Sequence, residues 1–170
     1  MRYIYYFSTF LQLTHGVKFK LELENYTKCV LSPGANHIHT GEISGLPAAL
    51  QGGEKHGVVG HKSGTQSATG CCGVLSWEIA DADDKLVIMY SIPYDQNLYS
   101  NWIGVGLYPK GDNPQFDDMY DGDEDNFKRK DFYYNMFPVS FSNEKFKVEG
   151  TCESTHTPTI VVKLHTKNES

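Results

Sequence analysis

Residues 86–107 read LVIMYSIPYDQNLYSNWIGVGL, with apolar segments on either side of a polar loop rich in aromatic residues. Residues 86–92 are almost continuously apolar, which is typical of a central strand buried on both faces. After the loop, Ile103, Val105 and Leu107 recur at every second position, as in a strand with one buried face. The stretch therefore predicts two strands.

The period of two continues in both directions along the chain. Residues 17–24 alternate between apolar and charged side chains, and residues 74–79 precede the strand at 86–92 across an acidic turn at 81–84. Residues 160–165 alternate again near the C-terminus. Many short strands separated by Gly- and Pro-rich turns predict an all-β sandwich or barrel. Residues 126–136 lack the alternation, and there we predict a short helix capped by Asp125 or Asn126.

The composition limits the classes of function. A chain of 170 residues without repeats or low-complexity linkers fits one domain with a substantial core. The net charge of −6 argues against a nucleic-acid partner, because phosphate binding needs clustered Lys and Arg. It also removes a polybasic route to anionic lipid. A membrane partner would therefore be held through neutral headgroups and aromatic side chains.

The N-terminal residues form a segment of their own. We divide the chain into an aromatic segment at 1–16 and a sandwich domain at 17–170. Arg2 is followed by an apolar run that Ser8, Thr9 and Gln12 interrupt, and small residues are missing near a plausible cleavage point. This pattern favours a retained segment over a cleaved signal peptide. A secreted and a cytoplasmic location both remain open.

The four cysteines are Cys29, Cys71, Cys72 and Cys152. Adjacent residues of a strand point to opposite faces, so Cys71 and Cys72 cannot share one side. No CxxC motif is present, so zinc-ribbon and thioredoxin sites are not indicated. Buried free thiols are the simplest interpretation, and a disulfide from Cys29 or Cys152 to one of the pair is the alternative.

One acidic segment begins like a calcium loop. Asp121, Asp123 and Asp125 have the D-x-D-x-D spacing, but Asn126 and Phe132 stand where an EF-hand needs Gly and Glu. A solvated acidic loop is the better interpretation.

Two other candidate sites, for a metal ion and for hydrolysis, also lack residues that their motifs require. His37 and His39 have the spacing of a shared metal, yet no further ligands can be named. Ser91 lacks the Gly-x-Ser-x-Gly context of a hydrolase. We therefore expect a protein that is not an enzyme and needs no metal or cofactor.

Residues 91–102, SIPYDQNLYSNW, resemble the central signature of the actinoporin family, the sea-anemone cytolysins and their relatives. Residues 68–75 resemble the strand that leads into this signature, and Tyr133-Tyr134-Asn135 resembles paired tyrosines that follow a short helix. The resemblance covers roughly residues 17–166. It implies a β-sandwich of two packed antiparallel sheets with one or two short flanking helices. It also implies binding to phosphocholine lipid headgroups and assembly of a homo-oligomer into a cation-conducting membrane pore.

The residue types at the implied site suit a phosphocholine group. Aromatic faces attract its quaternary ammonium by ~0.5–2 kcal/mol each, and hydroxyls or backbone amides can hold its phosphate. The resemblance and this chemistry together assign the headgroup site to Thr40, Cys72, Ser91, Pro93, Tyr99, Tyr120, Tyr133 and Tyr134. They assign membrane contact to a loop carrying Tyr94, Leu98 and Trp102, since Trp and Tyr favour the bilayer interface.

Three departures from the family pattern bear on function. Leu98 stands where anemone members carry a tryptophan important for sphingomyelin recognition, so selectivity for that lipid is not expected. The N-terminal segment is short for a bilayer-spanning helix of ~20 residues, and the chain is acidic. We therefore expect membrane binding to be more robust than lysis. The alternative is a non-lytic module that binds lipid or carbohydrate on the same fold, as fungal fruit-body lectins do.

Overall fold

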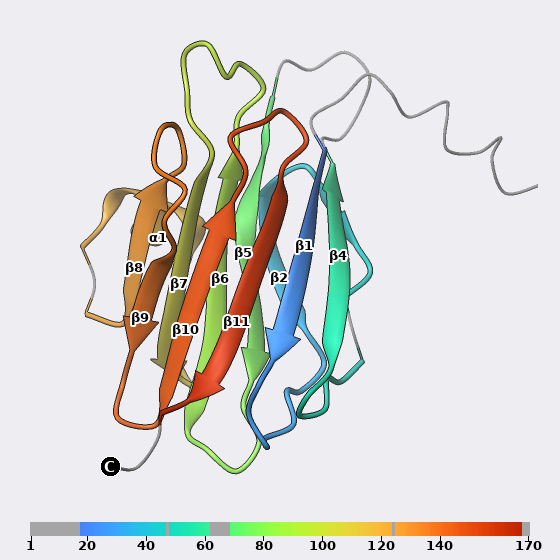
Figure 1. Cartoon of the computed structure of the whole chain (residues 1–170), viewed down its shortest axis with the longest axis vertical. Helices are drawn as coiled ribbons and strands as arrows, with labels where there is room; N and C mark the ends of the chain where they lie inside the picture. Colours follow the sequence, from blue (N-terminus) through green and yellow to red (C-terminus); the bar gives the residue numbers. More distant parts are fainter. Residues whose placement is uncertain (1–17, 47, 62–68, 124, 168–170) are drawn as a thin grey trace, which may run out of the picture.

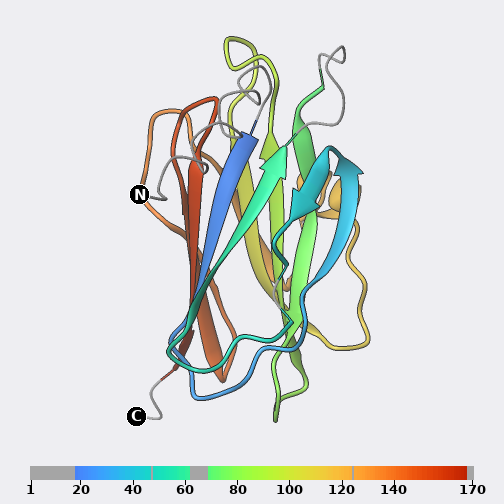
Figure 2. The same cartoon turned by 90° about the vertical axis from the view of Figure 1, so that its right-hand side faces the viewer.

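Two β-sheets pack face to face in the computed structural model, which describes residues 18–46, 48–61, 69–123 and 125–167 (Figures 1 and 2). The aromatic segment at 1–16 lies outside the described residues. One sheet has six strands in the order β3 (Glu42–Ser44), β4 (Lys55–His61), β1 (Lys18–Asn25), β11 (Thr159–Thr166), β10 (Phe146–Cys152) and β9 (Val139–Ser142). The other has five strands in the order β2 (Ala35–Thr40), β5 (Cys71–Glu78), β6 (Asp84–Ile92), β7 (Trp102–Pro109) and β8 (Phe127–Asp131). The predicted all-β sandwich is confirmed.

The pairing of β1 with β11 is the one feature that departs from the expected antiparallel sheets. Leu21 pairs with Ile160 and Leu23 with Val162 in parallel register, while all other named strand pairs in the described chain are antiparallel. Parallel neighbours need a long crossover, and here nearly the whole domain provides it. The alternation within each strand fixes which face is buried but contains no information about strand direction.

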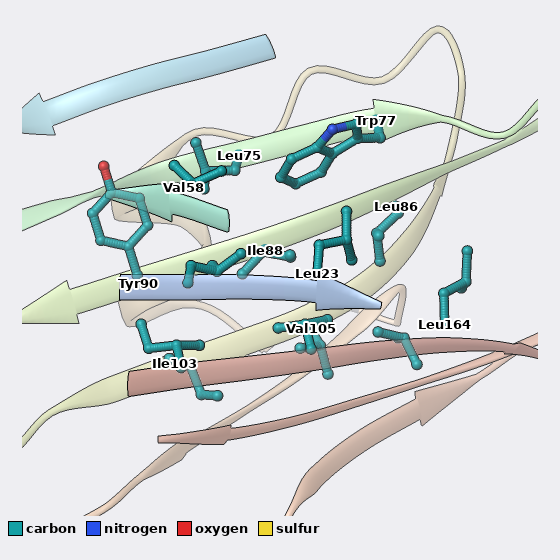
Figure 3. Packing of buried hydrophobic residues seen from close by; sticks show 14 of the residues in the cluster. Leu23, Val58, Leu75, Trp77, Leu86, Ile88, Tyr90, Ile103, Val105 and Leu164 are labelled. Carbon is teal, nitrogen blue, oxygen red and sulfur yellow. The ribbon is translucent and has the colours of Figure 1, made fainter. Parts of the chain in front are cut away.

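The core lies between the two sheets and follows the period of two. Alternate residues of β1, β5, β6, β7 and β11 point inward, and Figure 3 shows Leu75, Ile88, Tyr90, Val105 and Leu164 within the same apolar layer. Ile103, Val105 and Leu107 are all buried there, as their spacing predicts. Burial of such side chains contributes roughly 1.5–3 kcal/mol each, so this layer supplies most of the stability of the domain.

The predicted helix at 126–136 is wrong. Residues 127–131 form the edge strand β8, which pairs with β7 from Phe127 opposite Gly106 to Asp131 opposite Trp102. Four consecutive charged residues, 128–131, hide the alternation, because an edge strand can keep charged side chains near solvent. The single helix of the described chain, α1, instead spans Phe116–Asp121.

Helix α1 covers the outer face of the five-stranded sheet. Its buried Met119 packs with Val87 and Met89 of β6 and with Phe127 of β8 in a second apolar cluster. Gly104 and Gly106 leave this face of β7 without side chains, so neighbouring residues can lie flat across the strand. The helix is thus fixed above β5, β6 and β8, where it forms one wall of the site described below.

All four cysteines are free thiols in the structure, so neither alternative disulfide is formed. Cys71 and Cys152 lie in the core and Cys29 packs against it. Cys71 points inward and Cys72 outward, as expected for adjacent strand residues. Burial raises the pKa of the Cys71 and Cys152 thiols to about 12, which keeps them protonated and unreactive.

Glu24 breaks the alternation of β1, because this carboxylate is almost completely buried. It accepts hydrogen bonds from the Tyr26 hydroxyl and from the Lys55 ammonium, whose Nζ lies 3.0 Å from Oε1. These partners hold the pKa of Glu24 at about 2 although burial opposes ionisation. The ion pair therefore stabilises the fold only while Glu24 is charged.

We expect Glu24→Gln to lower the free energy of unfolding by about 1–3 kcal/mol at neutral pH. The unfolded carboxyl titrates near 4.5 and the folded one near 2, so its contribution is complete above pH 4.5. That contribution is lost as the pH falls from 4.5 through 2. Urea unfolding of both proteins across this range measures it, with the exposed Glu144→Gln as control. A difference that does not shrink in acid would contradict the assignment.

Candidate functional site

A row of side chains crosses the outer face of the five-stranded sheet at one end. Thr40 pairs with Cys72, Cys72 with Ser91, Ser91 with Trp102, and Trp102 with Asp131. Directly paired residues of antiparallel strands point to the same face, so all five side chains stand in one line. The first three form the floor of a pocket.

The walls of this pocket come from the loop at 93–101 and from α1. The pocket has a volume of about 340 Å³, and its described lining is His39, Thr40, Thr69, Gly70, Cys72, Ser91, Pro93, Tyr99, Ser100, Phe116 and Tyr120. Six of the eight residues predicted for headgroup binding therefore lie around one concavity. Tyr120, which is 21 positions from Tyr99 in the chain, reaches it because α1 lies against the outer face.

The wall on the helix side is a continuous series of aromatic rings. The ring centroids of His39 and Phe116 lie 5.0 Å apart, those of Phe116 and Tyr120 5.3 Å, and those of Tyr120 and Trp102 6.0 Å. The Arg129 guanidinium lies 5.7 Å from the centroid of the Trp102 ring and ends the series. Such stacked rings present their π faces and edges in fixed directions, which favours a cationic ligand beside them.

The floor is polar but uncharged. The Thr40 hydroxyl lies 3.1 Å from the Cys72 sulfur and 3.3 Å from the Gly70 carbonyl oxygen. Burial raises the pKa of the Cys72 thiol, so it is protonated at neutral pH. No Lys or Arg occurs in the described lining, and His39, with Nδ1 3.9 Å from an oxygen of Asp117, is its one basic residue. The pocket suits a ligand of zero net charge.

Residues of the signature that do not line the pocket hold the loop in place. Asn101 is buried and donates through Nδ2 to the carbonyls of Glu153 and Thr155, at 2.8 and 2.9 Å. Its Oδ1 accepts from Gln96 at 2.8 Å, and its own carbonyl accepts from the amide of Phe132. One asparagine thus connects three loops at this end of the sandwich.

Two of these loops expose apolar side chains. Trp102 begins β7 opposite the last residue of β8, so the loops at 93–101 and 132–138 leave the sheet at the same end (Figure 1). Seven of the nine exposed large hydrophobic side chains of the described chain lie on them: Tyr94, Leu98, Tyr99, Tyr133, Tyr134, Met136 and Phe137. We call these residues the apolar rim. A concentration of exposed apolar groups at one end indicates an interaction surface.

Three predicted residues lie elsewhere than expected. Tyr133 and Tyr134 do not line the pocket; they contact each other edge to face at 4.1 Å on the apolar rim, where Tyr134 is 89% exposed. Trp102 was expected on the loop, but it is half-buried in the strand between Tyr120 and Arg129. Pairing with Ser91 and Asp131 places Trp102 on the outer face of the sheet rather than at the loop tip.

Sequence reasoning missed other members of the site. His39, Thr69, Gly70, Ser100 and Phe116 also line the pocket. His39 and Ser100 adjoin Thr40 and Tyr99 in the chain, and Thr69 and Gly70 lie in the segment that resembles the strand leading into the signature, so these four had a signal in the sequence. Phe116 carried no such signal, because its place depends on a helix that was predicted elsewhere.

The described chain contains no group of three or more His, Cys, Asp or Glu side chains positioned for a metal ion. None of the same described residues form a helix with the length and apolar character needed to span a bilayer.

The model of the family described as sea anemone cytotoxic protein matches residues 38–164, which contain the floor and both walls of the pocket and the whole apolar rim. This chain belongs to the actinoporin family. Tereporin-Ca1 from Terebra anilis is 35% identical over 155 residues, covering 84% of this chain and 80% of the relative. Conoporin-Cn1 from Conus consors is 30% identical over 149 residues, covering 84% of this chain and 60% of the relative.

Similarity also extends to anemone proteins and to a solved structure. DELTA-actitoxin-Aas1a from Anthopleura asiatica is 37% identical over 78 residues, covering 44% of this actinoporin-like chain and 36% of the toxin. The crystal structure of the lipid binding protein Nakanori superposes with a TM-score of 0.68 over 88% of this chain and 71% of its own, at 14% identity. At that identity the likeness supports the fold alone.

Proposed function

We propose that this actinoporin-like protein binds membranes by placing a phosphocholine headgroup in the pocket and the apolar rim in the bilayer interface. The observation that carries this proposal is the position of the pocket, whose floor of Thr40, Cys72 and Ser91 opens beside exposed Leu98 and Tyr99. Aromatic walls suit the quaternary ammonium and the floor hydroxyls suit the phosphate. The function is binding, without catalysis.

The two remaining predicted tyrosines take a different part in this proposal. Tyr133 and Tyr134 stand on the rim, where their rings suit the boundary between headgroups and acyl chains. The absence of a tryptophan at Leu98 removes an indole donor from the loop, so the proposal includes no preference for sphingomyelin.

Phosphocholine itself is expected to protect the Cys72 thiol from alkylation. The thiol lies in the pocket floor, and at ten times the dissociation constant a bound ligand should slow its modification roughly tenfold. Tandem mass spectrometry after timed N-ethylmaleimide treatment at pH 8 separates Cys72 from Cys71 and gives Cys29 as an internal control. Equal rates for Cys72 with and without phosphocholine would place the ligand elsewhere.

We further propose that the membrane-bound protein is secreted and assembles into a homo-oligomeric cation-conducting pore on target cells. The names Tereporin-Ca1, Conoporin-Cn1 and Cytolysin tenebrosin-B support the pore and the lysis in this proposal. The aromatic segment at 1–16 is the candidate for membrane insertion, since aromatic residues favour the interface.

Removal of residues 1–13 is expected to leave vesicle association intact and to abolish dye release. The apolar rim and pocket are far along the chain from this segment, so binding does not need it. Co-sedimentation and dye release with phosphatidylcholine vesicles, with and without sphingomyelin, measure both activities. Dye release that persists would show that the segment does not form the pore. A full-length protein that binds vesicles but never releases dye would identify a non-lytic binding module instead.

A further inference from the structure

A second cleft lies beside α1, at the edge of the five-stranded sheet. It has a volume of about 450 Å³ and is lined by Trp102, Gly122, Asp123, Asp125, Phe127, Lys128 and Arg129. None of these residues lines the headgroup pocket, and the contact between Trp102 and Tyr120 separates the two. We call it the edge cleft.

The edge cleft contains charges of both signs that do not neutralise one another. Asp123 and Asp125 provide two carboxylates, and Arg129 provides a cation. Lys128 pairs with the core-facing Val105, so its side chain leaves β8 on the face opposite to that of Arg129. Within the described ranges, no ion pair joins either carboxylate to Arg129. The carboxylates and the cation of the cleft are therefore not paired with each other. A zwitterionic ligand would meet a group of opposite charge at each of its two ends.

The guanidinium of this cleft is already held in place. Arg129 Nη1 donates to the Met119 carbonyl oxygen of α1 at 3.4 Å, and its guanidinium lies against the Trp102 ring. Gly104 lacks a side chain beneath it: a Cβ there would lie 3.5 Å from the Cβ of Arg129. A fixed guanidinium binds phosphate oxygens with less loss of side-chain entropy than a free one.

We infer that the edge cleft binds a zwitterion with a phosphate and a primary ammonium, the phosphoethanolamine group. Arg129 would take the phosphate, and Asp123 and Asp125 would accept the N–H bonds of the ammonium. A quaternary ammonium has no N–H to donate, so phosphocholine fits the aromatic pocket better than this cleft. The inference concerns a second site and does not depend on phosphocholine binding in the first.

Tryptophan fluorescence can follow the edge cleft selectively. The chain has two tryptophans, and Trp77 is 1% exposed in the core, so a soluble ligand should change the signal of Trp102. In the Cys72→Phe variant, whose headgroup pocket is filled, we expect O-phosphoethanolamine to bind at least tenfold more tightly than phosphocholine, with glycine as a control for a zwitterion without phosphate. Calorimetry of the same titration detects binding that does not change the tryptophan fluorescence.

Two variants test the assignment of charges. Asp123→Asn with Asp125→Asn should remove the preference for O-phosphoethanolamine, and Arg129→Gln should weaken binding of this ligand severalfold. Asp81→Asn with Asp83→Asn, in the exposed β5–β6 turn, changes the net charge equally and should have no effect.

Three outcomes would overturn the inference. They are no binding by either method, equal affinity for the two phosphoesters, and a preference that survives the Asp123 and Asp125 substitutions. The affinity for O-phosphoethanolamine should be the same in the native protein and in Cys72→Phe, so failure of the first site is distinguishable from failure of the second. Vesicles of phosphatidylcholine with and without phosphatidylethanolamine then show whether the source is a lipid or the free phosphoester.

Discussion

Replacing Leu98 and Phe137 together by serine is expected to weaken binding to phosphatidylcholine vesicles by about two orders of magnitude. The two side chains are 73% and 77% exposed and project from different loops at the same end of the sandwich. Transfer of each into an apolar environment contributes ~1.5 kcal/mol or more, so their joint loss should cost about 3 kcal/mol, or roughly 100-fold. Co-sedimentation over a range of lipid concentrations measures this change.

The control for this pair is Ile38→Ser. Ile38 is also exposed, but it lies on β2 outside the apolar rim. Each loop is held by its own hydrogen bonds, such as the Phe137 amide to Asn135 Oδ1 at 2.9 Å, so serine should not change the fold. Equal losses for Ile38→Ser and the double variant would show that general hydrophobicity, not the rim, drives association.

Cys72→Phe is expected to abolish phosphocholine binding in the pocket. The residue stands in the middle of the floor between Thr40 and Ser91, and a phenyl ring there would occupy the space that a headgroup needs. Cys72→Ser, which keeps the size and a polar group, should bind phosphocholine within a few-fold of the native protein. Calorimetric titration with phosphocholine measures the affinity of both variants.

The thermal midpoint of Cys72→Phe separates a filled pocket from a damaged fold. Cys72 is half-buried on the outer face rather than in the core, so the midpoint should remain close to that of Cys72→Ser. A well-folded Cys72→Phe that still binds phosphocholine would refute the pocket as the headgroup site. Retained vesicle binding without phosphocholine binding would assign association to the apolar rim alone.

The asparagine in the signature illustrates why a motif mixes two kinds of residue. Tyr99 and Ser100 line the pocket, whereas Asn101 is buried and fastens the loop to Glu153, Thr155 and Phe132. Only some residues of the motif can therefore contact a ligand, and the others hold the loop in place. Sequence resemblance alone cannot separate the two groups, since both are equally part of the pattern.

The sequence by itself determined the strands with a clear alternation, the turn at 81–84 and the family. These features are local, because a period of two and a run of turn residues act on the backbone within a few positions. Thr40, Cys72 and Ser91 could also be assigned from resemblance, and strand pairing places all three in one row.

Only the tertiary structure decided the remainder. Residues 127–131 became a strand because β7 offered an unpaired edge, and β1 lies parallel to β11 because their order depends on contacts far apart in the chain. The same long-range packing put Phe116 and Tyr120 beside the floor, took Trp102 off the loop tip, and gathered the charges of the edge cleft. Such placements depend on the whole set of pairings, which no local pattern encodes.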